Sequence, residues 1–163
     1  MSDAVKELRE KLFYEKKNGL LKADDATLDS MQKYCEGYKA YLDAAKTERE
    51  AVIAAIALAE KKGFVPFVIG KQYNAGDKVY FNNRGKTVAF AVIGKELADK
   101  GINITAAHVD SPRLDLKPNP LYEELELALF KTHYYGGIKK YQWTALPLAL
   151  HGVFAKKDGS VIE

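Results

Sequence analysis

The residues best suited to chemistry form a His-x-Asp pair two thirds of the way along the chain. His108 and Asp110 follow an apolar, β-branched stretch, Ile102 to Ala107, and Pro112 comes soon after them. In extended backbone, residues i and i+2 point to the same face, so the imidazole and the carboxylate can act together. Such a pair suits a metal centre, in which histidine binds zinc through one ring nitrogen and the carboxylate fixes the orientation and tautomer of the ring.

The spacing alone has a second explanation. His108 can be a hydrogen-bonded histidine at a strand end, and Asp110 a turn or cap residue. Zinc takes about four donors, and His133 and His151 do not lie at a recognisable ligand spacing from His108. The position at the carboxyl end of an expected strand favours a functional role, because sites in sheets with parallel strands gather there. The residues by themselves indicate half of a metal site at most.

Composition narrows the classes of protein to consider. The chain has 163 residues, of which 47% are hydrophobic and 11% aromatic, enough to form a core. Its net charge of +3 is too small, and too evenly spread, to favour a nucleic-acid partner. Cys35 is the only cysteine, which excludes an intrachain disulfide and a cysteine-rich zinc site and suggests a small buried hydrophobe.

The chain also lacks the sequence features of membrane targeting. Residues 1–7 are charged and lack the apolar stretch of a signal peptide. The longest apolar run, Ala51 to Ala59, is far shorter than the roughly 20 residues that span a bilayer. We therefore expect a cytoplasmic protein with no membrane partner.

The elements that position the His-x-Asp pair begin with helices. Apolar residues recur at helical spacing through Leu28, Met31, Cys35, Tyr38, Leu42 and Ala45. Thr47 and Glu50 fit a capping box that opens a second helix, which Lys61, Lys62 and Gly63 are expected to end. Because this second helix is apolar almost all round from Ala51 to Ala59, we expect it to be buried on several sides.

Strands are expected from Phe64 onwards. Lys78–Phe81 and Lys86–Ile93 flank a turn-rich tetrapeptide and predict a hairpin, whose second strand is apolar enough from Val88 to be covered on both faces. Further strands are expected at Ile102–Ala107, Leu125–Leu129 and Trp143–Ala155, with Pro112 ending one ladder and Pro147 marking an edge or bulge. The fold class is α/β, with N-terminal helices and a mixed β-sheet.

The end of the sequence predicts a further hairpin. Lys156–Ser160 contains Asp-Gly, which tolerates the positive φ of a tight turn, and Val161–Glu163 would begin the return strand. A strand usually has about 5 residues. We therefore expect the chain to be the N-terminal portion of a longer protein.

The segment Ala107–Pro118 resembles the His-x-Asp-Ser-Pro-x-x-x-x-Lys-Pro motif of the M18 aminopeptidases, the family of aminopeptidase I and aspartyl aminopeptidase. Leu129–Ile138 is similar to the Tyr-Gly-Gly segment of that family, and the resemblance extends from about Tyr38 to the end of the chain. After Tyr-Gly-Gly the chain has Lys139–Ala145 where eukaryotic members carry an Asp-Arg pair, so it resembles the bacterial branch.

The resemblance implies a two-zinc exopeptidase that removes N-terminal residues from peptides and forms a homo-oligomer. Cobalt or manganese could replace zinc. His108 matches a histidine ligand of one zinc, and Asp110 matches the acid that orients the metal-site imidazole and is counted as catalytic. The implied fold is the first part of a phosphorylase/hydrolase-like zinc exopeptidase domain over residues 1–124, followed by the start of an inserted β domain over residues 125–163.

A second hypothesis is a non-catalytic binding or assembly module derived from the same fold. It is favoured by the shortage of ligands, because the bridging aspartate, the general-base glutamate and the other donors of such enzymes have no match in this sequence. On this hypothesis, the chain would contribute to oligomerisation rather than to hydrolysis.

Overall fold

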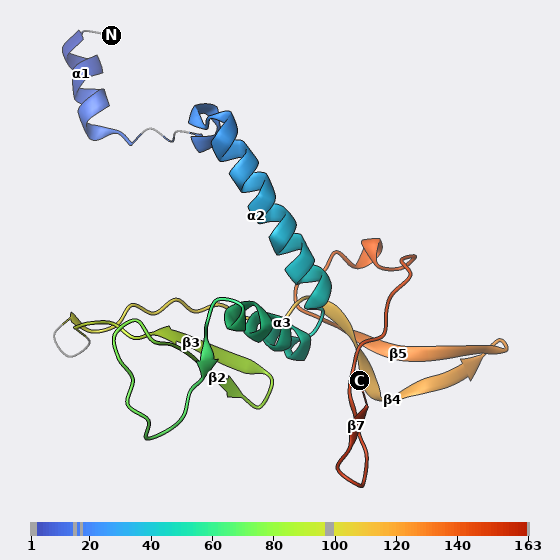
Figure 1. Cartoon of the computed structure of the whole chain (residues 1–163). Coiled ribbons are helices and arrows are strands. Elements are labelled where there is room, and N and C mark those ends of the chain that lie inside the picture. The colour runs from blue at the N-terminus through green and yellow to red at the C-terminus, as the bar shows by residue number, and fades with distance from the viewer. Residues whose placement is uncertain (1–2, 15, 17, 97–99, 163) are drawn as a thin grey trace. The chain divides into compact units, whose positions relative to one another are not determined.

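A computed structural model describes residues 3–14, 16, 18–96 and 100–162. Met1, Ser2 and Glu163, which entered the sequence analysis, lie outside these residues. The chain divides into two compact units, Met1–Lys39 and Ala40–Glu163. The first contains α1 (Asp3–Leu12), the short helix η1 (Gly19–Lys22) and most of α2 (Asp25–Ala44), and the second contains α3 (Glu48–Glu60) and all the described strands (Figure 1).

The predicted helix with the apolar stripe is confirmed as α2. It follows Asp24, whose side chain accepts a hydrogen bond from the backbone N–H of Thr27 at 2.8 Å. The expectation that Cys35 is buried is wrong, because this residue is exposed and no residue of α2 is buried. Of the stripe residues that the structure describes, Ala45 just after α2 is buried, whereas the large side chains, such as Met31 at 44%, are exposed. The apolar spacing therefore predicted the helix but not how far its side chains are buried.

The capping box at the start of α3 is confirmed. The Thr47 hydroxyl accepts from the N–H of Glu50 at 3.3 Å, and the Glu50 carboxylate accepts from the N–H of Thr47 at 2.8 Å. The expected stop is also confirmed, since Gly63 has φ of 83° and its N–H reaches the Glu60 carbonyl at 2.9 Å. These contacts fix where the chain enters and leaves α3.

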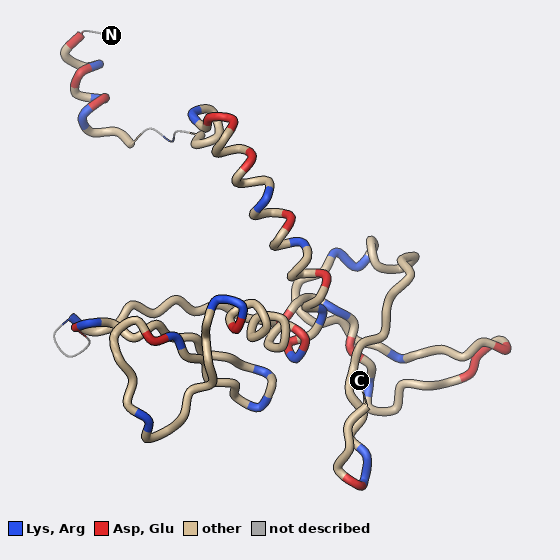
Figure 2. Tube along the Cα trace, viewed as in Figure 1, with Lys and Arg blue, Asp and Glu red and all other residues tan. Residues whose placement is uncertain are grey.

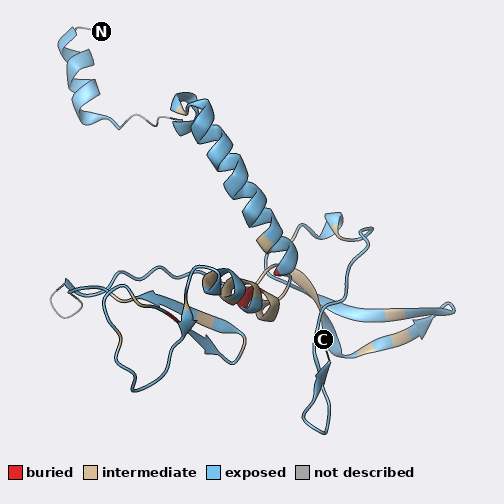
Figure 3. Ribbon diagram, viewed as in Figure 1, coloured by how far each residue is buried: buried red, intermediate tan, exposed pale blue. Residues whose placement is uncertain are grey.

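The described core is small. Its buried hydrophobic residues are Ala45, Ala51, Val52 and Val79 (Figure 3). The expectation that α3 is buried on several sides is wrong, because Ile53 is 56% exposed and Leu58 50% exposed. Of the residues of α3, Ala51 and Val52 are buried.

A mixed sheet lies beside α3. Its strands β1 (Val65–Pro66), β2 (Lys78–Asn83) and β3 (Thr87–Val92) run in that order, with β1 parallel and β3 antiparallel to β2. The predicted hairpin is thus confirmed, and positive φ at Arg84 and Gly85 suits its tight turn. The expectation that β3 is covered on both faces is wrong, since Val92 is 60% exposed. One helix covers only one face of a sheet.

Two expected strands do not form as predicted. Residues 102–107 have no regular structure, and of residues 143–155 only β6 (Phe154–Ala155) is strand. A strand needs a partner to satisfy its backbone groups, and no described strand pairs with residues 102–107. Pro112 therefore ends no ladder, and β4 (Arg113–Glu124) instead begins directly after it.

The longest strands form a hairpin of β4 with β5 (Leu127–Tyr135). Leu125 and Glu126, expected to open a strand, instead form its turn with positive φ. After the short helix η2 (Lys140–Gln142), the predicted final hairpin is confirmed, because Phe154 pairs with Ile162 of β7 (Val161–Ile162). The domain boundary expected at residue 125 falls in the β4–β5 turn and stays a prediction.

Charged residues of both signs occur along each unit, as Figure 2 shows. Oppositely charged side chains pair within α2, as in Lys39–Glu36, and at its end, as in Lys46–Asp43. Within the described residues, no helix is both long enough and apolar enough to cross a bilayer.

The capping glutamate of α3 also joins a distant segment. His151 Nδ1 lies 2.8 Å from Glu50 Oε1. Partial burial by itself would raise the pKa of the Glu50 carboxyl, but the hydrogen bonds with His151 and Thr47 outweigh it and lower this pKa below its ordinary value of 4.5. The ionised carboxylate therefore stabilises the native state.

We expect this contribution to be complete above the unfolded-state pKa of Glu50 and to disappear as pH falls through the lower folded-state pKa. Urea unfolding at a series of pH values between about 6 and 3 should show a smaller acid-induced loss of stability in Glu50→Gln than in the wild type. Glu123→Gln, which changes an exposed glutamate of β4, is the matched control. Parallel stability curves for wild type and Glu50→Gln would contradict the expectation.

Candidate metal and catalytic site

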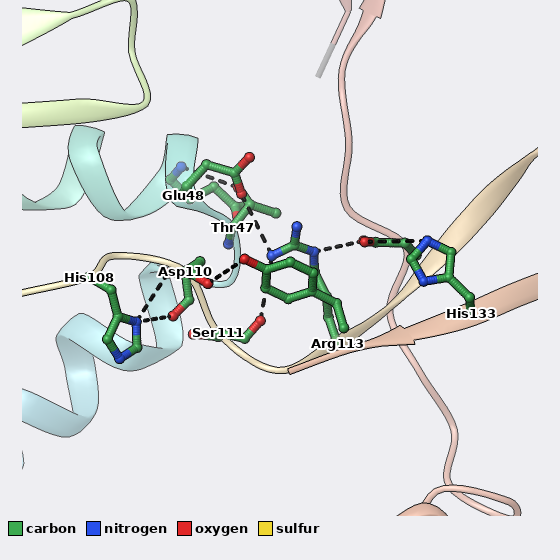
Figure 4. Close-up of polar contacts among 10 residues, drawn as sticks. Thr47, Glu48, His108, Asp110, Ser111, Arg113 and His133 are labelled. Atoms are coloured by element: carbon green, nitrogen blue, oxygen red, sulfur yellow. Dashed lines mark hydrogen bonds and ion pairs between the residues drawn. The ribbon is translucent and has the colours of Figure 1, made fainter. Parts of the chain in front are cut away.

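His108 and Asp110 lie in the irregular segment that leads into β4, and their side chains face each other (Figure 4). His108 Nδ1 is 3.1 Å from Asp110 Oδ1 and 2.9 Å from the Asp110 carbonyl oxygen. The predicted juxtaposition therefore occurs, although the backbone is not a strand. With its proton on Nδ1, His108 donates to Asp110 and leaves Nε2 as a free donor atom for a metal.

The second carboxylate oxygen of Asp110 is held from a distant part of the chain. The Tyr135 hydroxyl donates to Asp110 Oδ2 at 2.7 Å. This bond is the largest of several contacts that lower the pKa of the Asp110 carboxyl, and the same bond raises the pKa of the Tyr135 hydroxyl. Asp110 is thus a carboxylate at neutral pH, with both oxygens engaged.

Tyr135 belongs to a group of four side chains on one face of the β4–β5 hairpin. Arg113 pairs in register with Tyr135, and Asp115 pairs with His133, two residues further along each strand. Arg113 Nε donates to Asp115 Oδ1 at 2.7 Å, and the guanidinium carbon lies 4.1 Å from the centre of the Tyr135 ring. A cation over an aromatic face is a favourable contact that restrains both groups.

The group also reaches the start of α3. Arg113 Nη1 lies 3.9 Å from Glu48 Oε2. The hydrogen bond that Arg113 donates to Asp115 is the largest influence that raises the pKa of Arg113, with the charges of Asp115 and Glu48 acting in the same direction. The capped helix and the hairpin are therefore joined by an ion-pair network next to Asp110.

A glycine allows the hairpin to approach the His-x-Asp segment. Gly136 has φ of 75°, and a Cβ built there would lie 3.4 Å from Pro112 Cα. Other residues rarely adopt this backbone angle. The Tyr-Gly step thus brings the end of β5 against Pro112, and so brings Tyr135 to Asp110.

A hollow of about 370 Å³ lies beside the pair. Its lining includes His108, Asp110, Arg113 and Tyr135, together with Glu48 and residues 86–88. It therefore offers a concave surface of mixed polar and apolar character beside His108 and Asp110.

The donor chemistry fits one imidazole ligand with its orienting carboxylate. Among the described residues, no group of three or more histidine, cysteine, aspartate or glutamate side chains could hold a metal ion together. His108 is 81% exposed, so its ring is accessible to donors from outside this set. The fit to zinc is thus partial, with one ligand position supplied.

The other two histidines lie elsewhere. His133 Nε2 is 4.0 Å from Asp115 Oδ2, and His151 contacts Glu50. His151 was expected in a strand, but it lies in irregular backbone. Neither histidine lies with His108 in a ligand group among the residues described.

Sequence reasoning missed Tyr135, Arg113 and Glu48. A usable signal for the hairpin residues was present: Arg-x-Asp and His-x-Tyr place polar side chains on one face of each strand, at the two ends of a hairpin. The contact of Tyr135 with Asp110 spans 25 positions and could not be read from local spacing.

A comparison with known protein families identifies the family of the chain. The family model of aminopeptidase I zinc metalloproteases (M18) matches residues 41–163, which include both His108 and the hairpin. The chain belongs to the M18 family. The resemblance of Ala107–Pro118 is thereby confirmed at the level of the family.

Individual M18 relatives agree. A probable M18 family aminopeptidase 1 of Clostridium acetobutylicum is 50% identical over 156 residues, which cover 93% of this chain and 34% of the relative. A crystal structure of aminopeptidase I from Borrelia burgdorferi B31 is similar with a TM-score of 0.83 and 42% identity, over 90% of this chain and 36% of that one. The structure of an M18 aminopeptidase from Thermotoga maritima gives a TM-score of 0.81 at 41% identity, over 92% and 32%. The chain thus spans about a third of the length of the curated relatives it matches.

Proposed function

We propose that the chain is the N-terminal portion of a two-zinc aminopeptidase that hydrolyses N-terminal residues from peptides. The observation that carries the proposal is the His108–Asp110 contact, which leaves one imidazole nitrogen free within the region that matches a zinc metalloprotease family. The span of about a third of the curated relatives supports the view that other segments supply the remaining donors and the general base.

In this proposal His108 binds one metal ion through Nε2, and Asp110 holds the ring in the required tautomer and orientation. When bound, the zinc ions would supply an activated water and polarise the scissile carbonyl. Cobalt or manganese could take the place of zinc. Arg113 and Glu48 have no contact with the His108 ring among the described interactions. Arg113 contacts Glu48 and the Tyr135 ring, so their proposed role is to hold the residues beside Asp110 in place.

Peptides with a free N-terminus are the proposed substrates, and a homo-oligomer is the proposed assembly. Exposed apolar side chains of the β4–β5 hairpin, such as Leu121 at 65% and Leu125 at 87%, are available for contacts with further protein. The cytoplasmic location and the β domain starting at residue 125 stay predictions.

A second candidate function is a non-catalytic assembly module. It is favoured by the lack of a three-donor group among the residues that the structure describes. In this case His108 and Asp110 would be a structural hydrogen-bonded pair. The two functions differ in whether the protein made from the complete reading frame holds metal and cleaves peptides.

The test is an aminopeptidase assay of that protein with zinc, cobalt or manganese. We expect chelator-sensitive release of the first residue from peptides with a free N-terminus, and none from the same peptides after N-acetylation. Inactivity with all three metals would reject the proposed exopeptidase and favour the assembly module. Equal cleavage of acetylated peptides would reject both the exopeptidase and the non-catalytic module, because it would show a peptidase that does not need a free N-terminus.

A further inference from the structure

We propose that Tyr135 is a positioning residue for the metal-binding histidine, acting through Asp110. The inference rests on the proposed function and extends it to a residue 25 positions away from Asp110. Among the described hydrogen bonds, none joins Tyr135 to the His108 ring. Its hydroxyl instead binds the Asp110 oxygen that does not face His108.

Asp110 needs such a restraint because its own backbone provides little. The segment from Gly101 to Pro112 has no regular secondary structure, and the Asp110 side chain is 36% exposed. A carboxylate with one hydrogen bond can rotate about its side-chain torsions and turn away from the imidazole. With Tyr135 on Oδ2 and His108 on Oδ1, both oxygens are fixed and the plane of the carboxylate is defined.

Tyr135 is itself well fixed. It pairs in register with Arg113, whose guanidinium carbon lies 4.1 Å from the centre of its ring. Arg113 is held in turn by Asp115 at 2.7 Å and lies near Glu48 at the start of α3. The hydroxyl therefore belongs to a residue in a paired strand whose ring contacts Arg113, while the carboxylate that it holds belongs to an irregular segment.

Gly136 places the end of β5 next to the His-x-Asp segment. It lies in van der Waals contact with Pro112, the second residue after Asp110, and has φ of 75°, which residues other than glycine rarely adopt. This contact sets the spacing between the end of β5 and the His-x-Asp segment. The expected consequence is that the Tyr135 hydroxyl keeps His108 in the form protonated on Nδ1, with Nε2 ready for a metal.

The test compares Tyr135→Phe with Tyr134→Phe in the protein from the complete reading frame. Tyr135→Phe keeps the ring beneath Arg113 and removes only the hydroxyl. Tyr134→Phe makes the same chemical change one position earlier, on the opposite face of the strand. Zinc affinity is measured by competition with a chromophoric chelator, and the ring nitrogens of His108 are followed by ¹⁵N NMR in the metal-free protein.

We expect Tyr135→Phe to weaken zinc binding by about 10-fold, at the lower end of typical losses from outer-shell changes. The NMR signals of His108 should show a smaller fraction of the Nδ1-protonated form. Tyr134→Phe should match the wild type in both measurements. In the double variant with Asp110→Asn, loss of the Tyr135 hydroxyl should add little, because its effect passes through the carboxylate.

Wild-type zinc affinity and unchanged His108 signals in Tyr135→Phe would overturn the proposal, and so would an equal loss in Tyr134→Phe. Full additivity in the double variant would also contradict it. Failure of the proposed function is distinguished from failure of the positioning proposal by the wild-type protein. If the proposed function is wrong, the wild-type protein lacks aminopeptidase activity. The ring signals of the metal-free protein report on positioning whether or not that activity is present.

Discussion

Replacing His108 with alanine in the protein from the complete reading frame is expected to remove bound zinc and aminopeptidase activity together. The imidazole is the proposed metal donor, and the described residues provide no three-donor group that could take its place. The measurement is metal content by elemental analysis after gel filtration, alongside the release of N-terminal residues from a peptide. His151→Ala is the matched control, because this histidine contacts Glu50 and not Asp110.

Asp110→Asn provides a graded comparison for the same prediction. The substitution keeps the size of the side chain but replaces the carboxylate that faces His108 Nδ1. We expect a loss of about 10- to 100-fold in metal affinity or activity, with less metal lost than in His108→Ala. Normal metal content and wild-type rates in both variants would reject the roles assigned to the pair, as would equal losses in His151→Ala.

The metal content of His108→Ala also distinguishes the proposed aminopeptidase from the assembly module. A structural hydrogen-bonded pair at the edge of an assembly module would tolerate His108→Ala with no change in metal, since the protein would carry none. In that case His108→Ala would change the stability of the protein or its association with other chains. Metal content is therefore more informative than activity alone.

Elements encoded by adjacent residues could be predicted from the sequence. The capping box of Thr47 and Glu50, the turn at Arg84–Gly85 and the Asp-Gly hairpin near the end each depend on side chains within a few positions of one another. Local hydrogen bonding and backbone preference decide such features. The M18 resemblance of Ala107–Pro118 was recognisable for a related reason, because its residues are contiguous.

Burial and strand pairing were predicted less well, because both depend on remote partners. Residues 102–107 have the composition of a strand, yet no described strand supplies their ladder, and the apolar side of α3 is left partly exposed. Composition indicates that a segment can be covered, whereas the covering residues must come from elsewhere in the fold.

The candidate site shows the same division. The spacing of His108 and Asp110 predicted their contact, which two residues in extended backbone can make by themselves. Tyr135 joins them only because β4 and β5 pair in one register and Gly136 approaches Pro112. A one-residue change of register would turn Tyr135 to the other face, so its role depended on a pairing that the sequence did not specify locally.

The 163-residue chain on its own is expected to hold no pair of zinc ions and to show no peptidase activity. A zinc site needs about four donors, whereas His108 is the one imidazole that the proposal assigns to metal. Isothermal titration with zinc measures metal binding, and an assay with a peptide that has a free N-terminus measures hydrolysis. The protein from the complete reading frame is measured beside the isolated chain. His108→Ala in the isolated chain should change neither result appreciably.

The reason is geometric as well as numerical. The described residues fix the orientation of one ligand through Asp110, Tyr135 and Arg113, but a two-metal site must also fix the distance between two ions and the water that they share. Orientation of one imidazole cannot supply that distance. Binding of two zinc ions per chain with chelator-sensitive hydrolysis would therefore show that these 163 residues contain donors that the His108 site does not include, and it would require the ligand assignment to be rebuilt.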